Sequence, residues 1–170
     1  VLPDALSPEL QDASTGYDMK GIWSGDTVTD NGTTFNFYTQ VNHGSSFNPG
    51  IAVAPSTDPS QTVWEKQGPL FGVEGARDFR DPYLWEDEGG WHMIIGAALE
   101  TGGGLVYYTS DDLFSWRQQS GFSSIPYREM DIGSQIWEMP LFEQVEGDTW
   151  ILLANPIGGE VGGFPSAKIT

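Results

Sequence analysis

Polar and apolar residues alternate in short runs along this chain, and very few segments follow the spacing of an amphipathic helix. Residues 34–40 form such a run directly after Asn31-Gly32, a pair typical of a tight hairpin turn. Loops rich in Gly, Asp and Ser separate the runs, so the pattern predicts an all-β chain with at most one helical turn, at residues 8–13. The other strand-like runs are at residues 51–54, 62–65, 82–86, 91–95, 104–109, 140–143 and 149–153.

Three segments share one layout: a carboxylate, a strand, a turn that contains Gly, and a strand led by an aromatic residue. The carboxylates are Asp26, Asp81 and Glu138, spaced 55 and 57 residues apart. A second feature repeats in phase, because Thr-Asp at 57–58 leads to a Trp at 64 and Ser-Asp at 110–111 leads to a Trp at 116. We expect these two Trp side chains to belong to the core. The agreement in phase indicates an internal repeat.

A period in the fifties, with about four short strands per unit, is typical of β-propeller blades. The chain is therefore predicted to form one incomplete β-propeller domain over residues 1–170, with about three blades of four-stranded antiparallel sheets. The first strand of a blade lines the axis, so the repeated carboxylates are expected to face an axial pocket. An ordinary β-sandwich is the alternative architecture. The blades are expected near residues 21–70, 77–120 and 134–157, followed by a Gly-rich tail at 158–170.

Composition and charge exclude several classes of function. Seven Lys and Arg against 24 Asp and Glu give a net charge of −17, which disfavours nucleic acid and anionic membrane surfaces as partners. There is no Cys, and His43 and His92 lie far apart, so we expect no disulfide, no metal site and no cofactor. No apolar run has the length of about 20 residues that a membrane helix needs. Many aromatic residues among 22 Gly and 11 Pro are typical of secreted carbohydrate-active proteins, so we expect an extracellular protein, although the first residues do not form a signal-peptide pattern.

Two of the repeated carboxylates have neighbours suited to glycoside cleavage, which needs one acid to protonate the leaving oxygen and a carboxylate to attack or stabilise the sugar carbon. Asp81 follows Arg80, whose charge favours the ionised carboxylate that charge stabilisation requires. Glu138 lies between Trp137 and Met139, and apolar surroundings favour the protonated form that a general acid needs. The alternative for each residue is an ordinary solvated loop carboxylate.

Three motifs in order and spacing resemble glycoside hydrolase family 32, which contains the invertases, inulinases and levanases. They are Gly-Ile-Trp-Ser-Gly at 21–25, Phe-Arg-Asp-Pro at 79–82 and Trp-Glu-Met-Pro at 137–140, and the resemblance extends from Leu2 to about Ile157. It implies a five-bladed propeller that binds sucrose or a fructan oligosaccharide and cleaves it with retention, through a covalent fructosyl-enzyme.

The resemblance also implies roles for individual residues. Asp81 matches the transition-state stabiliser, which binds fructose hydroxyls together with Arg80, and Glu138 matches the general acid/base. Trp23 and Ser24 match the motif that lines the sugar site.

Two further residues are candidates for substrate binding. Asp26 occupies the position at which the family usually has Ser, and it is either an extra substrate contact or a carboxylate at the start of a strand. Trp137, beside the expected acid, is the Trp that we regard as a candidate for stacking on a sugar.

The nucleophile of the family lies in an Asn-Asp-Pro-Asn-Gly motif, and no Asn-Asp-Pro occurs in this sequence. We therefore expect a fragment that lacks the nucleophile and is inactive alone. About three blades would leave sheet edges open, which predicts self-association or a partner that supplies the missing blades. Two alternatives stay open: a non-catalytic fructan-binding or oligomerising module, and a related furanosidase such as an arabinofuranosidase.

Overall fold

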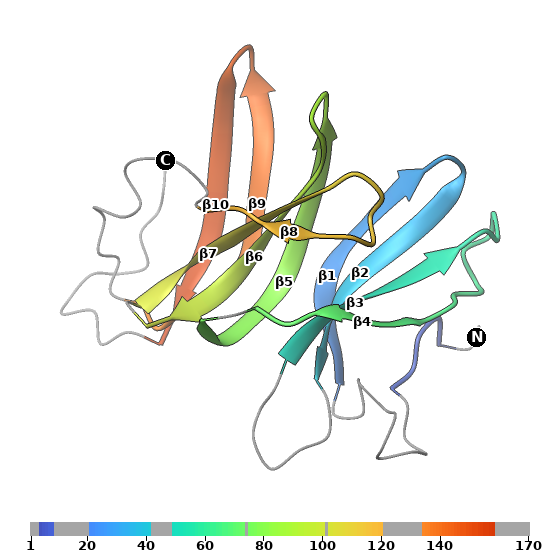
Figure 1. The fold of residues 1–170 in the computed structure, drawn as a ribbon, viewed down its shortest axis with the longest axis horizontal. Coiled ribbons are helices and arrows are strands. Elements are labelled where there is room, and N and C mark those ends of the chain that lie inside the picture. Colours follow the sequence, from blue (N-terminus) through green and yellow to red (C-terminus); the bar gives the residue numbers. More distant parts are fainter. Residues whose placement is uncertain are drawn as a thin grey trace.

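The computed structural model describes residues 4–8, 21–41, 49–73, 75–100, 102–120 and 134–158, which form ten antiparallel strands and no helix (Figure 1). This confirms the predicted all-β class. No helix in this described part is therefore long and apolar enough to cross a membrane. The first sheet contains β1 (Gly21–Asp30), β2 (Thr33–Val41), β3 (Pro49–Ser56) and β4 (Gln67–Phe71); the second contains β5 (Ala76–Asp87), β6 (Gly90–Leu99), β7 (Gly102–Ser110) and β8 (Arg117–Gln118); the hairpin contains β9 (Ile136–Glu146) and β10 (Thr149–Ile157).

Most of the predicted strands and turns are present, with two differences. Asn31 and Gly32 form the predicted hairpin turn, with positive φ angles of 47° and 79°. The predicted strand at 62–65 is absent, because the Trp64 indole donates to the carbonyl of Gln61 at 2.8 Å and the segment turns on itself before β4. The third unit shows two strands, β9 and β10, within the described residues, where the repeat predicted four. The expected helical turn at 8–13 lies almost entirely outside those residues, as does His43.

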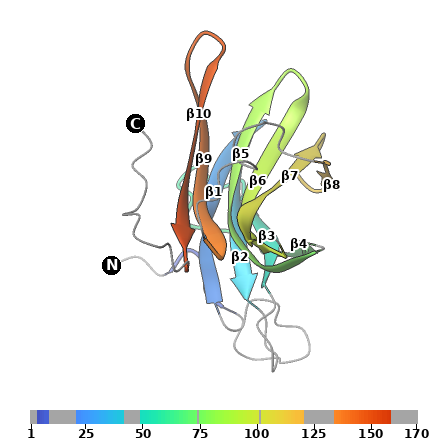
Figure 2. The ribbon, with the colours of Figure 1, turned by 90° about the vertical axis from the view of Figure 1, so that its left-hand side faces the viewer.

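The three units follow one another side by side. β1 contacts β5, and β5 contacts β9, so the first strands of the units are neighbours (Figure 1). Figure 2 shows the hairpin as the last layer on one side of the molecule. Neighbouring first strands are what the predicted propeller requires of consecutive blades.

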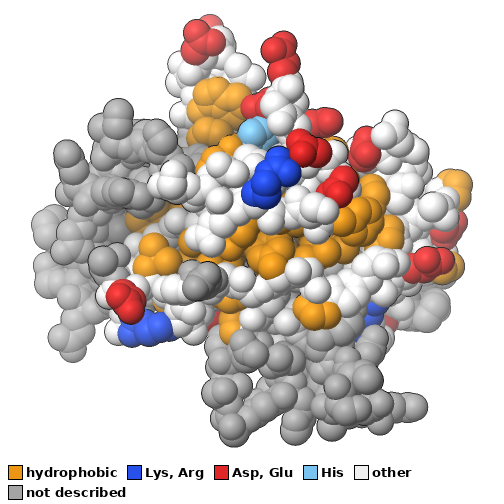
Figure 3. Space-filling view, viewed as in Figure 1, with side chains coloured by type: hydrophobic (Ala, Val, Ile, Leu, Met, Phe, Trp, Pro, Cys, Tyr) orange, Lys and Arg blue, Asp and Glu red, His pale blue; other side chains and the backbone are white. Residues whose placement is uncertain are grey.

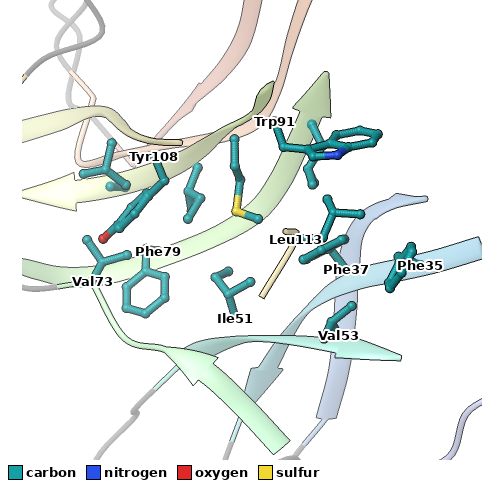
Figure 4. Close-up of a cluster of buried hydrophobic side chains, with 14 residues drawn as sticks. Phe35, Phe37, Ile51, Val53, Val73, Phe79, Trp91, Tyr108 and Leu113 are labelled. Carbon is teal, nitrogen blue, oxygen red and sulfur yellow. The ribbon is translucent and has the colours of Figure 1, made fainter. Parts of the chain in front are cut away.

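The main core lies between the first and second sheets (Figure 4). Phe37 and Ile51 from the first sheet and Met93 and Ile95 from the second are fully buried. Burying a side chain of this size contributes about 1.5–3 kcal/mol. Ile94, between Met93 and Ile95, faces the other way and packs with Leu105 and Trp137 in a cluster that joins the second sheet to the hairpin. β6 therefore has apolar neighbours on both faces.

The outer edges of both four-stranded sheets carry the same hydrogen-bonded turn. Trp64 and Trp116 each donate an indole N–H to the carbonyl three residues earlier, at 2.8 and 3.0 Å. Asp58 and Asp112 accept N–H groups from the residues that follow them. Asp58 and Asp112 therefore have equivalent roles in their sheets. The sequence spacing had instead matched Asp58 with the residue before Asp112. Both Trp rings pack on the clusters of their sheets, as expected for core residues.

The hairpin is the least buried unit. Leu141, Ile151 and Leu153 are 36%, 40% and 42% exposed. Figure 3 shows apolar side chains on the hairpin and across the middle of the same side of the molecule. In the described part of the chain, the second sheet covers one face of the hairpin and no strand covers the other.

Candidate active site

Each first strand carries a β-bulge at the same place in its register. The residues that precede the bulges are Trp23 in β1, Arg80 in β5 and Glu138 in β9. The sequence spacing had instead aligned Asp26 and Asp81 with Glu138. That alignment is wrong, because Asp26 lies three residues after Trp23 and Asp81 one residue after Arg80, so neither of them precedes its bulge as Glu138 does.

Arg80 joins the three units at this level. Its Cζ lies 4.9 Å from the centre of the Trp23 ring, which is a cation–π contact. Its Nη1 donates to Glu138 Oε1 at 3.2 Å, and its Nη2 forms an ion pair with Asp78. The Arg80, Asp78 and Glu138 side chains are each about one-fifth to one-quarter exposed. The structure therefore brings three of the predicted site residues into contact and adds Asp78.

Asp81 lies within the β5 bulge and is buried, with a left-handed φ of 58°. Its backbone N–H donates to Thr39 Oγ1 at 2.9 Å, and its Oδ2 accepts the Met139 N–H at 3.0 Å. Burial raises the pKa of the Asp81 carboxyl, while the Met139 N–H and the charge of Arg80 act to lower it. Arg80 thus acts in the direction that the sequence predicted, but burial has the larger effect, so the pKa of Asp81 is raised.

The surroundings of Glu138 are charged rather than apolar. Trp137 is 5% exposed and packs between the second sheet and the hairpin, whereas Met139 is 52% exposed. Trp137 is packed away in the core and Met139 is open to solvent, so these apolar neighbours do not enclose the carboxylate, and Arg80 contacts it instead. The buried Trp137 offers no open ring face to a sugar, whereas Trp23 is 36% exposed.

Asp26 lies three residues after Trp23, so it is not one of the residues that precede the bulges. Its Oδ1 accepts the Thr27 N–H at 2.7 Å and its Oδ2 accepts the Leu84 N–H at 2.8 Å. Burial raises the pKa of this carboxyl, and the two N–H groups act to lower it. Both oxygens therefore serve the backbone, and one of them ties β1 to β5.

Ser24 lies in the β1 bulge, and its backbone carbonyl accepts the Thr39 hydroxyl at 3.1 Å. The Ser24 residue is exposed beside Trp23. Ser24 and Asp81 thus share Thr39 as a partner.

The N-terminal domain of glycosyl hydrolases family 32 matches residues 4–167 of this chain. The chain belongs to glycosyl hydrolases family 32. A sucrose-6-phosphate hydrolase of Bacillus subtilis is 31% identical over 163 residues, which are 94% of this chain and 33% of that protein. The chain thus spans about a third or less of the length of these curated relatives.

Solved structures of family 32 share the fold. A Bombyx mori β-fructofuranosidase in complex with sucrose is 26% identical, with a TM-score of 0.75 over 95% of this chain and 33% of that one. A sucrose-6-phosphate hydrolase from Lactobacillus gasseri is 22% identical, with a TM-score of 0.70 over 88% of this chain and 30% of that one. These family 32 neighbours are β-propellers, which confirms the propeller class, while the number of blades in the ring stays a prediction.

The sequence interpretation missed two residues of this candidate site, Asp78 and Thr39. Asp78 stands two residues before Arg80 on one strand, so alternation alone would place both side chains on one face. Thr39 could have been found from the turn at Asn31-Gly32, which fixes the β1–β2 register and brings Thr39 close to Ser24.

Proposed function

We propose that this chain supplies the general acid/base and the transition-state stabiliser of a retaining β-fructofuranosidase that acts on sucrose or fructans. One observation carries the proposal. Arg80 of one blade contacts Glu138 of the next at 3.2 Å, and Asp81, the residue after Arg80, receives a hydrogen bond from Met139, the residue after Glu138. The carboxylates of Asp81 and Glu138 are therefore both held by contacts between two neighbouring blades, in the motifs that resemble those of the family.

Glu138 has the role of acid and then base. It protonates the oxygen of the leaving sugar in the first step and takes a proton from water in the second. Arg80 Nη1 contacts Glu138 Oε1 at 3.2 Å and so holds the side chain in one place for both steps.

Asp81 has the role of stabilising the positive charge that develops on the fructosyl ring. The Met139 N–H occupies Oδ2, which leaves Oδ1 to accept a fructose hydroxyl. This role requires the ionised form, and Arg80 and the Met139 N–H both favour ionisation against the cost of burial.

Retention also requires a nucleophilic carboxylate. It is not among the residues that precede the bulges, because Trp23 has that position in β1. No Asn-Asp-Pro occurs in the 170 residues. We therefore propose that the 170 residues alone do not cleave fructosides, and that the nucleophile comes from another blade of a five-bladed ring.

Titration of the isotope-labelled chain with fructose, followed by NMR, tests the site. Fructose is expected to shift the signals of the Trp23 indole and of Arg80, and Trp23→Ala should abolish saturable binding. Trp150→Ala is the matched control, because Trp150 is 40% exposed but lies at the far end of the hairpin. Equal loss in both variants, or no loss in Trp23→Ala, would contradict the proposal.

A second candidate, an oligomerising module, is favoured by the exposed apolar residues of the hairpin, Leu141, Ile151 and Leu153. Light scattering, with fructose release from sucrose assayed on the same fractions, separates the possibilities. A monomer without release agrees with the main proposal. An assembly that releases fructose would show that copies of this chain complete the ring and supply the nucleophile between them.

A further inference from the structure

Thr39 stands between the two bulges that carry the predicted sugar-binding residues. It lies in β2 opposite Trp23 and is fully buried. Its hydroxyl donates to the Ser24 carbonyl at 3.1 Å and accepts the Asp81 N–H at 2.9 Å. One hydroxyl therefore uses its donor and an acceptor site to join the irregular part of β1 to the irregular part of β5.

The bond to Asp81 matters because the backbone there is in an unfavourable conformation. Asp81 and Met139 have φ angles of 58° and 48°, in the left-handed region that residues other than Gly seldom adopt. Such a conformation persists only when surrounding contacts hold it. The Thr39 hydroxyl holds the Asp81 N–H, and the Asp81 carboxylate in turn holds the Met139 N–H at 3.0 Å.

The next blade has no equivalent hydroxyl. The residue opposite Arg80, at the register position that corresponds to Thr39, is Gly96. A Cβ on Gly96, in β6, would lie 2.1 Å from the carbonyl oxygen of Trp137 in β9, so the second sheet and the hairpin meet here by close backbone contact. A bridging hydroxyl is thus found where the first sheet meets Asp81 of the second sheet, and has no equivalent where the second sheet meets the hairpin.

We propose that Thr39 is a positioning residue of the active site, which sets the direction of the Asp81 carboxylate and, through the Met139 N–H, the place of the β9 bulge beside Glu138. The inference rests on the proposed function, in which Asp81 is the stabiliser and Glu138 the acid/base. Thr39 itself does not contact the sugar.

The test compares Thr39→Val, which keeps the shape but removes the hydroxyl, with Thr39→Ser, which keeps the hydroxyl. Thr34→Val is the matched control, because Thr34 is a buried Thr of the same strand whose hydroxyl contacts Thr29 and Gln61 at the other end of the hairpin. In Thr39→Val we expect hydrogen exchange of the Asp81 amide to accelerate about tenfold or more, as for loss of one hydrogen bond. The NMR titration midpoint of the Asp81 carboxyl should move upward, and fructose binding should weaken.

Thr39→Ser should return all three measurements towards wild type, and Thr34→Val should leave them unchanged even if it lowers stability. Wild-type exchange and titration of Asp81 in Thr39→Val, or equal changes in Thr34→Val, would overturn the inference. If Thr39→Val does not fold, the wild-type chain still decides the matter, since an Asp81 amide that exchanges as fast as an unprotected one contradicts the bond. Failure of wild type to bind fructose would instead contradict the proposed function, because the exchange and carboxyl measurements need no sugar.

Discussion

Two seams join the three units: the first lies between the first and second sheets, at β1 and β5, and the second lies between the second sheet and the hairpin, at β5 and β9. Both have the same kind of hydrogen bond. In each, an Asp of the earlier strand accepts the backbone N–H of a residue 58 positions later in the neighbouring strand. Asp26 accepts from Leu84 at 2.8 Å, and Asp81 accepts from Met139 at 3.0 Å. The same link thus recurs, although the two Asp residues occupy different positions relative to the bulges.

The two seams differ in what else the linking carboxylate must do. Both oxygens of Asp26 accept backbone N–H groups, so this residue has a structural role. Asp81 has one oxygen bound by Met139 and is also the proposed stabiliser of the reaction. A change at the first seam should therefore affect stability, whereas a change at the second should affect stability and the site together.

The largest expected effect comes from closing the space at the second seam. In Gly96→Ala the new Cβ would lie 2.1 Å from the backbone oxygen of Trp137, which cannot move without separating the hairpin from the second sheet. We expect a loss of about 3 kcal/mol in the free energy of unfolding, measured by urea denaturation. Gly68→Ala is the control, because a Cβ there meets nothing within 4 Å, and it should change stability by less than about 0.5 kcal/mol. Equal stability of the two variants would show that the second seam is not closed by backbone contact.

Much of the fold followed from the sequence, because turn chemistry and period are local properties. Asn31-Gly32 fixed one hairpin, and the pairing of Asp30 with Thr33 leads along the strands towards Ser24 opposite Thr39. Because of the bulge in β1, Thr39 pairs with Trp23 instead of Ser24, and no residue type in the sequence predicts the bulge. This is why the motifs were found while their alignment across blades was wrong.

The environment of a charge was less predictable than its position in the sequence. The pKa of Asp81 depends on burial, which the whole packing sets, whereas its Arg neighbour is visible in the sequence. Glu138 likewise has apolar neighbours along β9 but a guanidinium from β5 beside its carboxylate. Both environments are therefore set by residues that lie far away along the chain.

The second expected effect concerns the first seam. Asp26→Ala removes the acceptor for the Leu84 N–H, which then lies partly buried without its partner. The free energy of unfolding should fall by about 1–2 kcal/mol. Glu86→Ala, an exposed Glu on β5, should leave it unchanged within about 0.5 kcal/mol. Since Asp26 is a structural link, fructose binding by the folded Asp26→Ala chain should match wild type, and a selective loss of binding would instead make Asp26 a substrate contact.

The smallest expected effect is the response of stability to pH. The buried Asp residues at the seams and the Asp residues of the exposed turns should contribute to it with opposite sign. Burial is the main cause that raises the pKa of Asp26, Asp78 and Asp81. A carboxyl with a raised pKa in the folded state contributes stability at low pH that is lost as pH rises through that pKa. The exposed turn residue Asp112 behaves oppositely, because N–H groups of Ser115 and Phe114 lower its pKa to about 2, so its contribution is lost as pH falls.

The free energy of unfolding should therefore be higher at about pH 5 than at about pH 7, because carboxyls with a raised pKa take up protons at a higher pH in the folded chain than in the unfolded one, while Asp112 stays ionised at both pH values. Each buried carboxyl should contribute less than about 1 kcal/mol, because solvent screens groups that are only partly buried. Relief of the repulsion within a chain of net charge −17 acts in the same direction. The double variant Asp26→Asn/Asp81→Asn separates the two causes, since it leaves most of the charge but removes the titration at the seams. Urea unfolding at both pH values should then give a smaller rise, and a rise equal to wild type would show that Asp26 and Asp81 do not cause the pH response.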